Sequence, residues 1–141
     1  MTEIRRLAHV ERIPIRWGDM DAMGHVNNTV YFRYMEQTRI GWMDALVPRV
    51  GRHRPVSIVI ANASCNFLRP ITYPGTVEVR LYTGKPGGAS VPTYYELRVD
   101  DAPEVYADGA SVVVFIDPQT QKSKRIPEDL REKLLHAEVA A

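Results

Sequence analysis

A single long helical pattern, followed by four alternating segments, constrains the fold of this chain most strongly. Between Asn28 and Val47, aromatic and apolar side chains recur at intervals of three and four residues, which predicts one helix. Asn27 or Asn28 suits its N-terminal cap, because a side-chain oxygen there can accept an unpaired backbone N–H, and Pro48 ends it. At 1.5 Å per residue this helix is about 30 Å long, which is enough to cross a small sheet.

Four segments alternate between apolar and polar residues with a period of two, which is typical of strands, and a fifth predicted strand is apolar on both faces from Val112 to Ile116. The first runs from His9 to Trp17 and contains Pro14, which has no N–H for a ladder, so we expect this strand at a sheet edge or a bulge. The other four follow the helix, separated by turns rich in Gly, Pro and Asp, at residues 59–67, 77–81, 93–99 and 110–116.

This order predicts an α+β fold in which a five-stranded antiparallel sheet packs on the long helix, and a short amphipathic helix over residues 126–137 follows. The chain has 141 residues, of which 45% are hydrophobic, so residues 1–141 are expected to form a single domain with its own core. One helix covers only one face of five strands. The other face or an edge is therefore expected to meet a second subunit.

Charge and motifs exclude several functional classes. Lys and Arg number 18 against 17 Asp and Glu, so no basic field predicts binding to nucleic acid or to an acidic membrane. No run approaches the roughly 18 apolar residues of a transmembrane helix, and the N-terminus has no apolar signal segment, so we expect a cytoplasmic protein. A P-loop, a dinucleotide fingerprint and a serine-hydrolase elbow are all missing, and the scattered histidines predict no metal site.

Cys65 is the single cysteine of the chain, so it cannot form an internal disulfide. It alternates in phase with Val59, Ala61, Ala63 and Phe67, which predicts that all five share one apolar face of a strand. We therefore expect a buried structural cysteine rather than a nucleophile.

Residues 16–28 carry the densest set of reactive side chains. Two carboxylates, Asp19 and Asp21, precede His25, Asn27 and Asn28 between the first strand and the helix. A helix N-terminus offers unpaired N–H groups and a partial positive charge, which can hold a developing oxyanion opposite a carboxylate. This arrangement indicates an acyl-transfer site. The alternative is that the aspartates only form turns, one asparagine only caps the helix and the histidine packs in the loop.

Two motifs resemble the 4-hydroxybenzoyl-CoA thioesterase-like family of hotdog-fold enzymes. The resemblance is to the branch that carries His-Val-Asn-Asn and includes acyl-CoA and plant acyl-ACP thioesterases, and it covers about residues 8–135. The first motif reads Arg16-x-x-Asp19-x-Asp21-x-x-Gly24-His25-Val26-Asn27-Asn28-x-x-Tyr31-x-x-Tyr34-x-Glu36-x-x-Arg39. The second reads Phe67-x-Arg69-Pro70-Ile71-x-x-Pro74-Gly75.

The resemblance implies a hotdog fold, in which the sheet wraps around the long helix, and a thioesterase that hydrolyses an acyl-CoA or acyl-ACP. Coenzyme A is then part of the substrate, and no metal or redox cofactor is implied. The sites of the family lie at the interface of a homodimer whose sheets pair edge to edge. On the same resemblance we expect a homotetramer as the full assembly.

The resemblance also implies roles for single residues. Asp21, and not Asp19, matches the catalytic carboxylate, which acts as a nucleophile or as a base for water. The backbone N–H of Asn28 is implied as the oxyanion donor. His25 and Asn27 are implied to polarise or orient the water and the thioester.

Two further positions are assigned to substrate binding, Gly24 next to His25 and Glu36 two helical turns beyond Asn28. The alternative for Glu36 is an ion pair with Arg33 or Arg39, three residues away on the same helix.

Two other functions use the same fold. A hotdog hydratase or dehydratase has an Asp-x4-His spacing, whereas Asp21 and His25 are separated by three residues. A non-catalytic module that binds acyl thioesters is the second alternative. Release of free thiol from acyl-CoA distinguishes an enzyme from such a module.

Overall fold

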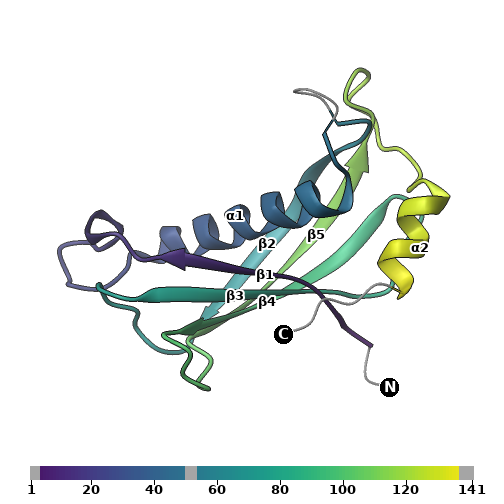
Figure 1. Cartoon of the computed structure of the whole chain (residues 1–141). Helices are drawn as coiled ribbons and strands as arrows, with labels where there is room; N and C mark the ends of the chain where they lie inside the picture. The colour runs from purple at the N-terminus through teal and green to yellow at the C-terminus, as the bar shows by residue number, and fades with distance from the viewer. Residues whose placement is uncertain (1–3, 50–53, 137–141) are drawn as a thin grey trace.

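The computed structural model describes residues 4–49 and 54–136, and its elements follow the order that the sequence predicts (Figure 1). The elements are β1 (Arg6–Pro14), the 3-10 turn η1 (Trp17–Asp19), α1 (Asn28–Leu46), β2 (Ser57–Phe67), β3 (Thr76–Thr83), β4 (Ser90–Val99), β5 (Ala107–Ile116) and α2 (Glu128–His136). The α+β class and the five-stranded antiparallel sheet are confirmed. Residue 137 of the predicted second helix lies outside the described residues.

The sheet has the strand order β1-β3-β4-β5-β2, and all four pairings are antiparallel. α1 lies across one face of this sheet, and α2 lies at one end of it (Figure 1). β1 and β2 are the two edges, so Pro14 is in an edge strand as expected, although the strand ends there and does not continue to Trp17. Trp17 instead belongs to η1 and is 73% exposed.

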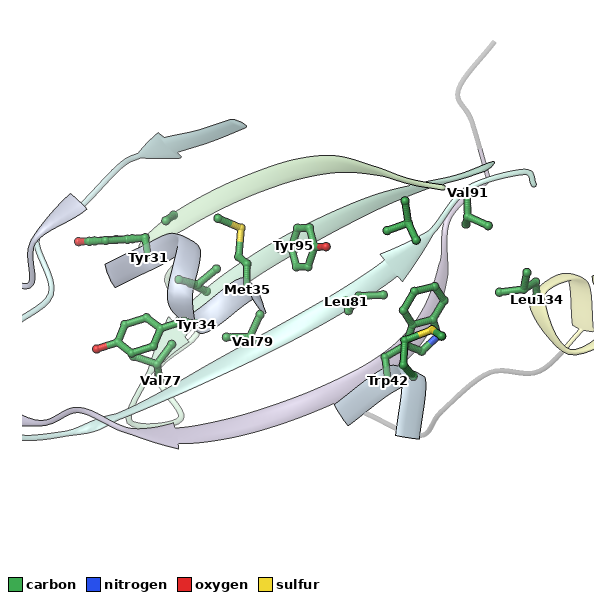
Figure 2. Close-up of a cluster of buried hydrophobic side chains, with 14 of the residues drawn as sticks. Tyr31, Tyr34, Met35, Trp42, Val77, Val79, Leu81, Val91, Tyr95 and Leu134 are labelled. Atoms are coloured by element: carbon green, nitrogen blue, oxygen red, sulfur yellow. The ribbon is translucent and has the colours of Figure 1, made fainter. Parts of the chain in front are cut away.

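The core forms where the apolar side chains along one side of α1 meet the inner face of the sheet. These side chains, which recur at intervals of three and four residues, are called the helical stripe. From α1 the side chains of Tyr31, Tyr34, Met35 and Trp42 belong to the same buried cluster as residues of β3 and β4 (Figure 2). The sheet contributes the alternate residues that the period of two predicts, among them Val77, Val79, Leu81, Val91, Tyr95 and Leu97, each exposed by 1% or less. The helical stripe predicted for α1 and the alternation predicted for β3 and β4 therefore pack against each other in the core.

The predicted phase of β2 is wrong because the strand contains a bulge. The register with β5 shifts between Ile60 and Asn62, so the residues before and after this point change faces. Ile58 and Ile60 pair with buried residues of β5 and pack toward the core, whereas Val59 is 45% exposed. Cys65 is half-buried rather than buried, because β2 is an edge strand.

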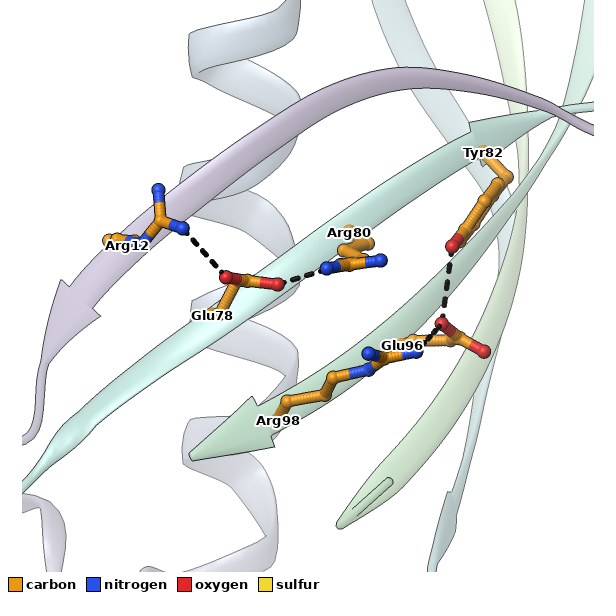
Figure 3. Close-up of polar contacts among 6 residues, drawn as sticks. All are labelled: Arg12, Glu78, Arg80, Tyr82, Glu96 and Arg98. Carbon is orange, nitrogen blue, oxygen red and sulfur yellow. Dashed lines mark hydrogen bonds and ion pairs between the residues drawn. The ribbon is translucent and has the colours of Figure 1, made fainter. Parts of the chain in front are cut away.

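The outer face of the sheet is charged. Glu78 of β3 accepts hydrogen bonds from Arg12 at 2.9 Å and from Arg80 at 2.7 Å (Figure 3). On β4, Glu96 pairs with Arg98 at 3.2 Å. Arg80 beside Glu78 holds the pKa of that carboxyl below its usual value. The part of this face formed by β1, β3 and β4 thus carries ion pairs, and the pair of Arg12 with Glu78 joins two neighbouring strands.

Among the residues that the structure describes, neither helix combines the length and apolar composition needed to span a bilayer. The cytoplasmic location stays a prediction.

Gly109 of β5 is expected to be intolerant of a side chain. A Cβ there would lie 2.5 Å from Sδ of Met35 and 3.1 Å from the carbonyl oxygen of Ser64. Gly109→Ala therefore overpacks the contact between α1 and the sheet, and we expect it to lower the free energy of unfolding by about 1–3 kcal/mol. Gly88→Ala is the control, because its nearest neighbour is 3.9 Å away. Urea unfolding of both variants measures the difference, and equal stabilities would contradict the packing described here.

Candidate active site

The loop between β1 and α1 is held to the core at both ends. After β1, the buried Ile15 donates its backbone N–H to the carbonyl of Gly75 at 2.8 Å. At the other end, the N–H of the buried Val26 donates to the carbonyl of Ile71 at 2.8 Å, and Val26 also forms a β-bridge with Met20. Residues 20–26 are therefore a short hairpin that projects from two fixed points.

A tight turn at the tip of this hairpin brings Asp21 and His25 together. The Asp21 N–H donates to the carbonyl of His25 at 2.9 Å, and the Gly24 N–H donates to the carbonyl of Asp21 at 3.0 Å. Gly24 has a φ of 82°, a left-handed conformation that glycine adopts without steric cost. Its assignment to substrate binding is untested, whereas its part in the turn is plain from this geometry.

The Asp21 carboxylate is exposed, and both of its oxygens accept hydrogen bonds from its own loop. Oδ1 accepts from the Met23 N–H at 2.9 Å, and Oδ2 accepts from Nδ2 of Asn27 at 2.9 Å. The Met23 N–H, followed by the Asn27 amide, holds the pKa of Asp21 below its usual value. The group is therefore ionised at neutral pH and has a fixed orientation.

Asn27, and not Asn28, is the N-cap of α1. Its Oδ1 accepts from the Thr29 N–H at 2.9 Å and from the Thr29 hydroxyl at 2.6 Å. Because Nδ2 is bonded to Asp21, this one side chain connects the carboxylate to the start of the helix.

The helix N-terminus opens onto a shallow cavity of about 240 Å³. His25 and Asn28 line it together with Tyr31 and with residues 67–70, where β2 ends. Within residues 4–49 and 54–136, the Asn28 N–H donates to no acceptor, as expected for the first residue of a helix. The cavity therefore offers an unpaired donor at the positive end of α1.

Glu36 is not brought to this cluster. It lines a separate cleft of about 770 Å³ between β1 and α1, together with Asp19, Arg33 and Tyr34. In the part of the chain that the structure describes, Glu36 forms no ion pair with Arg33 or Arg39, and its assignment to substrate binding stays a prediction.

Cys65 has the properties of an unreactive thiol. Burial, followed by the nearby charge of Asp108, raises its pKa to about 11, so the thiol stays protonated at neutral pH. In the described ranges, no group of three or more His, Cys, Asp and Glu side chains is placed to hold a metal ion.

One contact in the loop is not predicted by the sequence. The hydroxyl of Tyr34 donates to Oδ2 of Asp19 at 2.9 Å. Both residues belong to the first motif, but they lie 15 positions apart on different elements, and no periodicity links them.

The chain matches the thioesterase-like superfamily over residues 15–134. It is 26% identical over 132 residues to the long-chain acyl-CoA thioesterase FadM of Escherichia coli, covering 87% of this chain and 94% of the relative. The PA2801 protein of Pseudomonas aeruginosa superposes with a TM-score of 0.82 and 33% identity, over 92% of this chain and 99% of that one. A Thermus thermophilus thioesterase solved with coenzyme A and Zn gives a TM-score of 0.78 and 28% identity, over 91% and 98%.

The turn at Gly24 is expected to depend on its backbone conformation alone. A Cβ at Gly24 or at Gly18 would meet no atom within 4 Å, but only Gly24 has a positive φ. Gly24→Ala should therefore lower the free energy of unfolding by about 1–2 kcal/mol or distort the loop, whereas Gly18→Ala should have little effect. Chemical unfolding and backbone chemical shifts of residues 19–27 measure the two outcomes. A Gly24→Ala protein identical to the Gly18→Ala protein in both measurements would contradict this account.

Proposed function

The chain belongs to the thioesterase-like superfamily and is a thioesterase, and we propose that it hydrolyses the thioester of an acyl-CoA with Asp21 as the catalytic carboxylate. The observation that carries the proposal is the loop geometry, in which Asn27 holds the ionised Asp21 carboxylate and caps the helix whose first N–H, that of Asn28, is unpaired in the described residues. The His-Val-Asn-Asn sequence supports a place in that branch of the hotdog enzymes.

In the proposed reaction the thioester carbonyl oxygen accepts a hydrogen bond from the Asn28 N–H, at the positive end of α1. This contact stabilises the negative charge that develops on the oxygen as the carbonyl carbon is attacked. His25, which lines the same cavity, and Asn27 are proposed to orient the water and the thioester. Gly24 is proposed to border the bound substrate through the turn that it forms.

Two routes lead to the same products. In one, an Asp21 oxygen attacks the carbonyl carbon, the C–S bond breaks, the thiolate leaves and takes a proton, and water then hydrolyses the mixed anhydride. In the other, Asp21 accepts a proton from the attacking water. The lowered pKa keeps Asp21 ionised at neutral pH, which both routes require.

Both routes yield a carboxylic acid and a free thiol, and neither transfers electrons. The proposal therefore needs no metal or redox cofactor beyond the coenzyme A of the substrate, and we expect full activity in the presence of EDTA. The names of the Escherichia coli and Thermus thermophilus relatives support coenzyme A as the carrier. Assays with acyl-CoAs of short, long and aromatic acyl groups, and with acyl-ACP, identify the preferred acyl group and carrier.

We further propose that residues 1–141 are one domain and that it forms a homodimer through β2. One buried cluster from Ile15 to Leu134 supports the single domain. The edge of β2 supports the dimer, because none of its residues from Ser57 to Phe67 is charged or a proline. Exposed edges are normally protected by such residues, as β1 is by Pro14, so an unprotected edge favours pairing with another strand. A tetramer of two such dimers stays a prediction.

The first test replaces the carboxylate. Asp21→Asn removes the negative charge and the basicity, so kcat should fall by about 10²–10⁴-fold. The amide keeps the size of the side chain but loses one of its two hydrogen bonds, so thermal unfolding is measured in parallel. Cys65→Ala is the control and should retain kcat within a few-fold.

A folded Asp21→Asn protein with more than about a tenth of the wild-type kcat would remove Asp21 from the mechanism. Loss of activity in the Cys65→Ala protein would instead point to the thiol. Tight acyl-CoA binding by the wild-type protein without thiol release would favour the binding module.

The second test concerns the dimer. A lysine in the middle of β2, Asn62→Lys, places two like charges near each other if the strands pair, so it should shift the protein toward monomer. Val10→Lys in the middle of β1 is the matched control and should not. Light scattering at micromolar concentration measures the mass. A wild-type monomer with full activity would overturn the dimer.

A further inference from the structure

We propose that Tyr34 and Asp19 are positioning residues that fix the Asp21 carboxylate relative to the helix N-terminus. The inference rests on the proposed thioesterase function and names what holds that site in place. Its basis is a continuous series of hydrogen bonds that starts in the core and ends at Asp21.

The series begins at a side chain that cannot easily move. Tyr34 lies in the second turn of α1, is 4% exposed and packs in the cluster of Figure 2. Its hydroxyl donates to Oδ2 of Asp19 at 2.9 Å. Burial, followed by the Asp19 carboxylate, raises the pKa of Tyr34, so the hydroxyl is protonated at neutral pH and can donate.

Asp19, held by the buried Tyr34, in turn holds the backbone of the loop through further hydrogen bonds. The same Oδ2 that accepts from Tyr34 also accepts from the Arg16 N–H at 2.9 Å. The backbone carbonyl of Asp19 accepts from the Asn27 N–H at 3.0 Å. Asp19 therefore connects the end of β1, the second turn of α1 and the residue that caps α1.

Asn27 completes the series. Its backbone is held by Asp19, and its Nδ2 donates to Oδ2 of Asp21 at 2.9 Å. The next residue, Asn28, carries the proposed oxyanion donor. The carboxylate is thus placed, through Tyr34, with reference to the helix that itself carries the N–H.

The hydroxyl group of Tyr34 is not needed for packing of the core. In the described residues the Tyr34 hydroxyl has Asp19 as its single hydrogen-bond partner, so phenylalanine would fill the same apolar volume without it. The hydroxyl acts on the loop and not on the core. Reaction rates respond steeply to misplacement of a catalytic group, and a shift of about 1 Å costs about 10²-fold.

The experiment compares three variants. Tyr34→Phe and Asp19→Ala each break the series, so kcat should fall by about 10–100-fold while KM stays within about two-fold, because the substrate surface is unchanged. Asp19→Asn should retain most of kcat, because both donors reach one oxygen, which the amide carbonyl can replace. Tyr95→Phe is the control for loss of a buried hydroxyl, since Tyr95 bonds to Thr93, Ser111 and Arg39 away from the loop.

Two readouts separate positioning from a general loss of stability. Hydrogen exchange of the Asn27 backbone N–H should be faster in Tyr34→Phe and Asp19→Ala, and unchanged in Asp19→Asn and Tyr95→Phe. In an Asp21→Asn background, Tyr34→Phe should cause no further loss of kcat, because it acts through Asp21.

The outcomes are distinct. If Asp21→Asn keeps its activity, the proposed mechanism fails. If Asp21→Asn is inactive but Tyr34→Phe and Asp19→Ala keep the wild-type kcat, only the positioning role fails. Equal losses in Asp19→Asn and Asp19→Ala, or an additive loss in the double variant, also overturn it. Should Tyr34→Phe not fold, the comparison at Asp19 decides alone.

Discussion

Packing of one helical stripe against the inner face of the sheet is the interaction on which the rest of this structure depends. It buries Tyr31 and Tyr34 in the first two turns of α1, and so determines where the helix begins relative to the loops around it. The Tyr31 hydroxyl then contacts the backbone at Ile71 and Arg69, and the Tyr34 hydroxyl meets Asp19. The N-terminus of α1 is thereby placed beside the end of β2, where the cavity lies.

The two faces and two edges of the sheet have different chemistry, and this difference underlies the proposed dimer. Over β1, β3 and β4 the outer face carries ion pairs that centre on Glu78 and Glu96 (Figure 3). Both edge strands contain a bulge, but the β1 edge also contains Pro14 and charged residues, whereas the β2 edge has neither a proline nor a charge. Partner binding at β2 would enclose the exposed Phe67 and the cavity that it lines. This explains how a site that is shallow in one chain could become a closed one.

Within the loop, Asn27 has two structural roles that are chemically linked. As a cap it satisfies helix N–H groups that would otherwise lack partners, and as a donor it stabilises the charged form of Asp21. The same amide therefore supports the helix end that would bind an oxyanion and the carboxylate that would act on the carbonyl. Glu36, which shares the motif and the helix, points into another cleft and has no part in this cluster.

The sequence by itself determined the elements, their order and the loop that carries the reactive groups, because each depends on periodicity or on neighbouring residues. The stripe from Tyr31 to Trp42 and the alternation in β3 and β4 are local patterns that tertiary packing only had to bring together. The sequence could not reveal the bulge that changes the phase of β2 before Cys65, because a bulge is set by register against β5. It also could not reveal the contact of Tyr34 with Asp19 or the position of Glu36. Those depend on which way a helix faces once its stripe is buried, and only tertiary packing decides that.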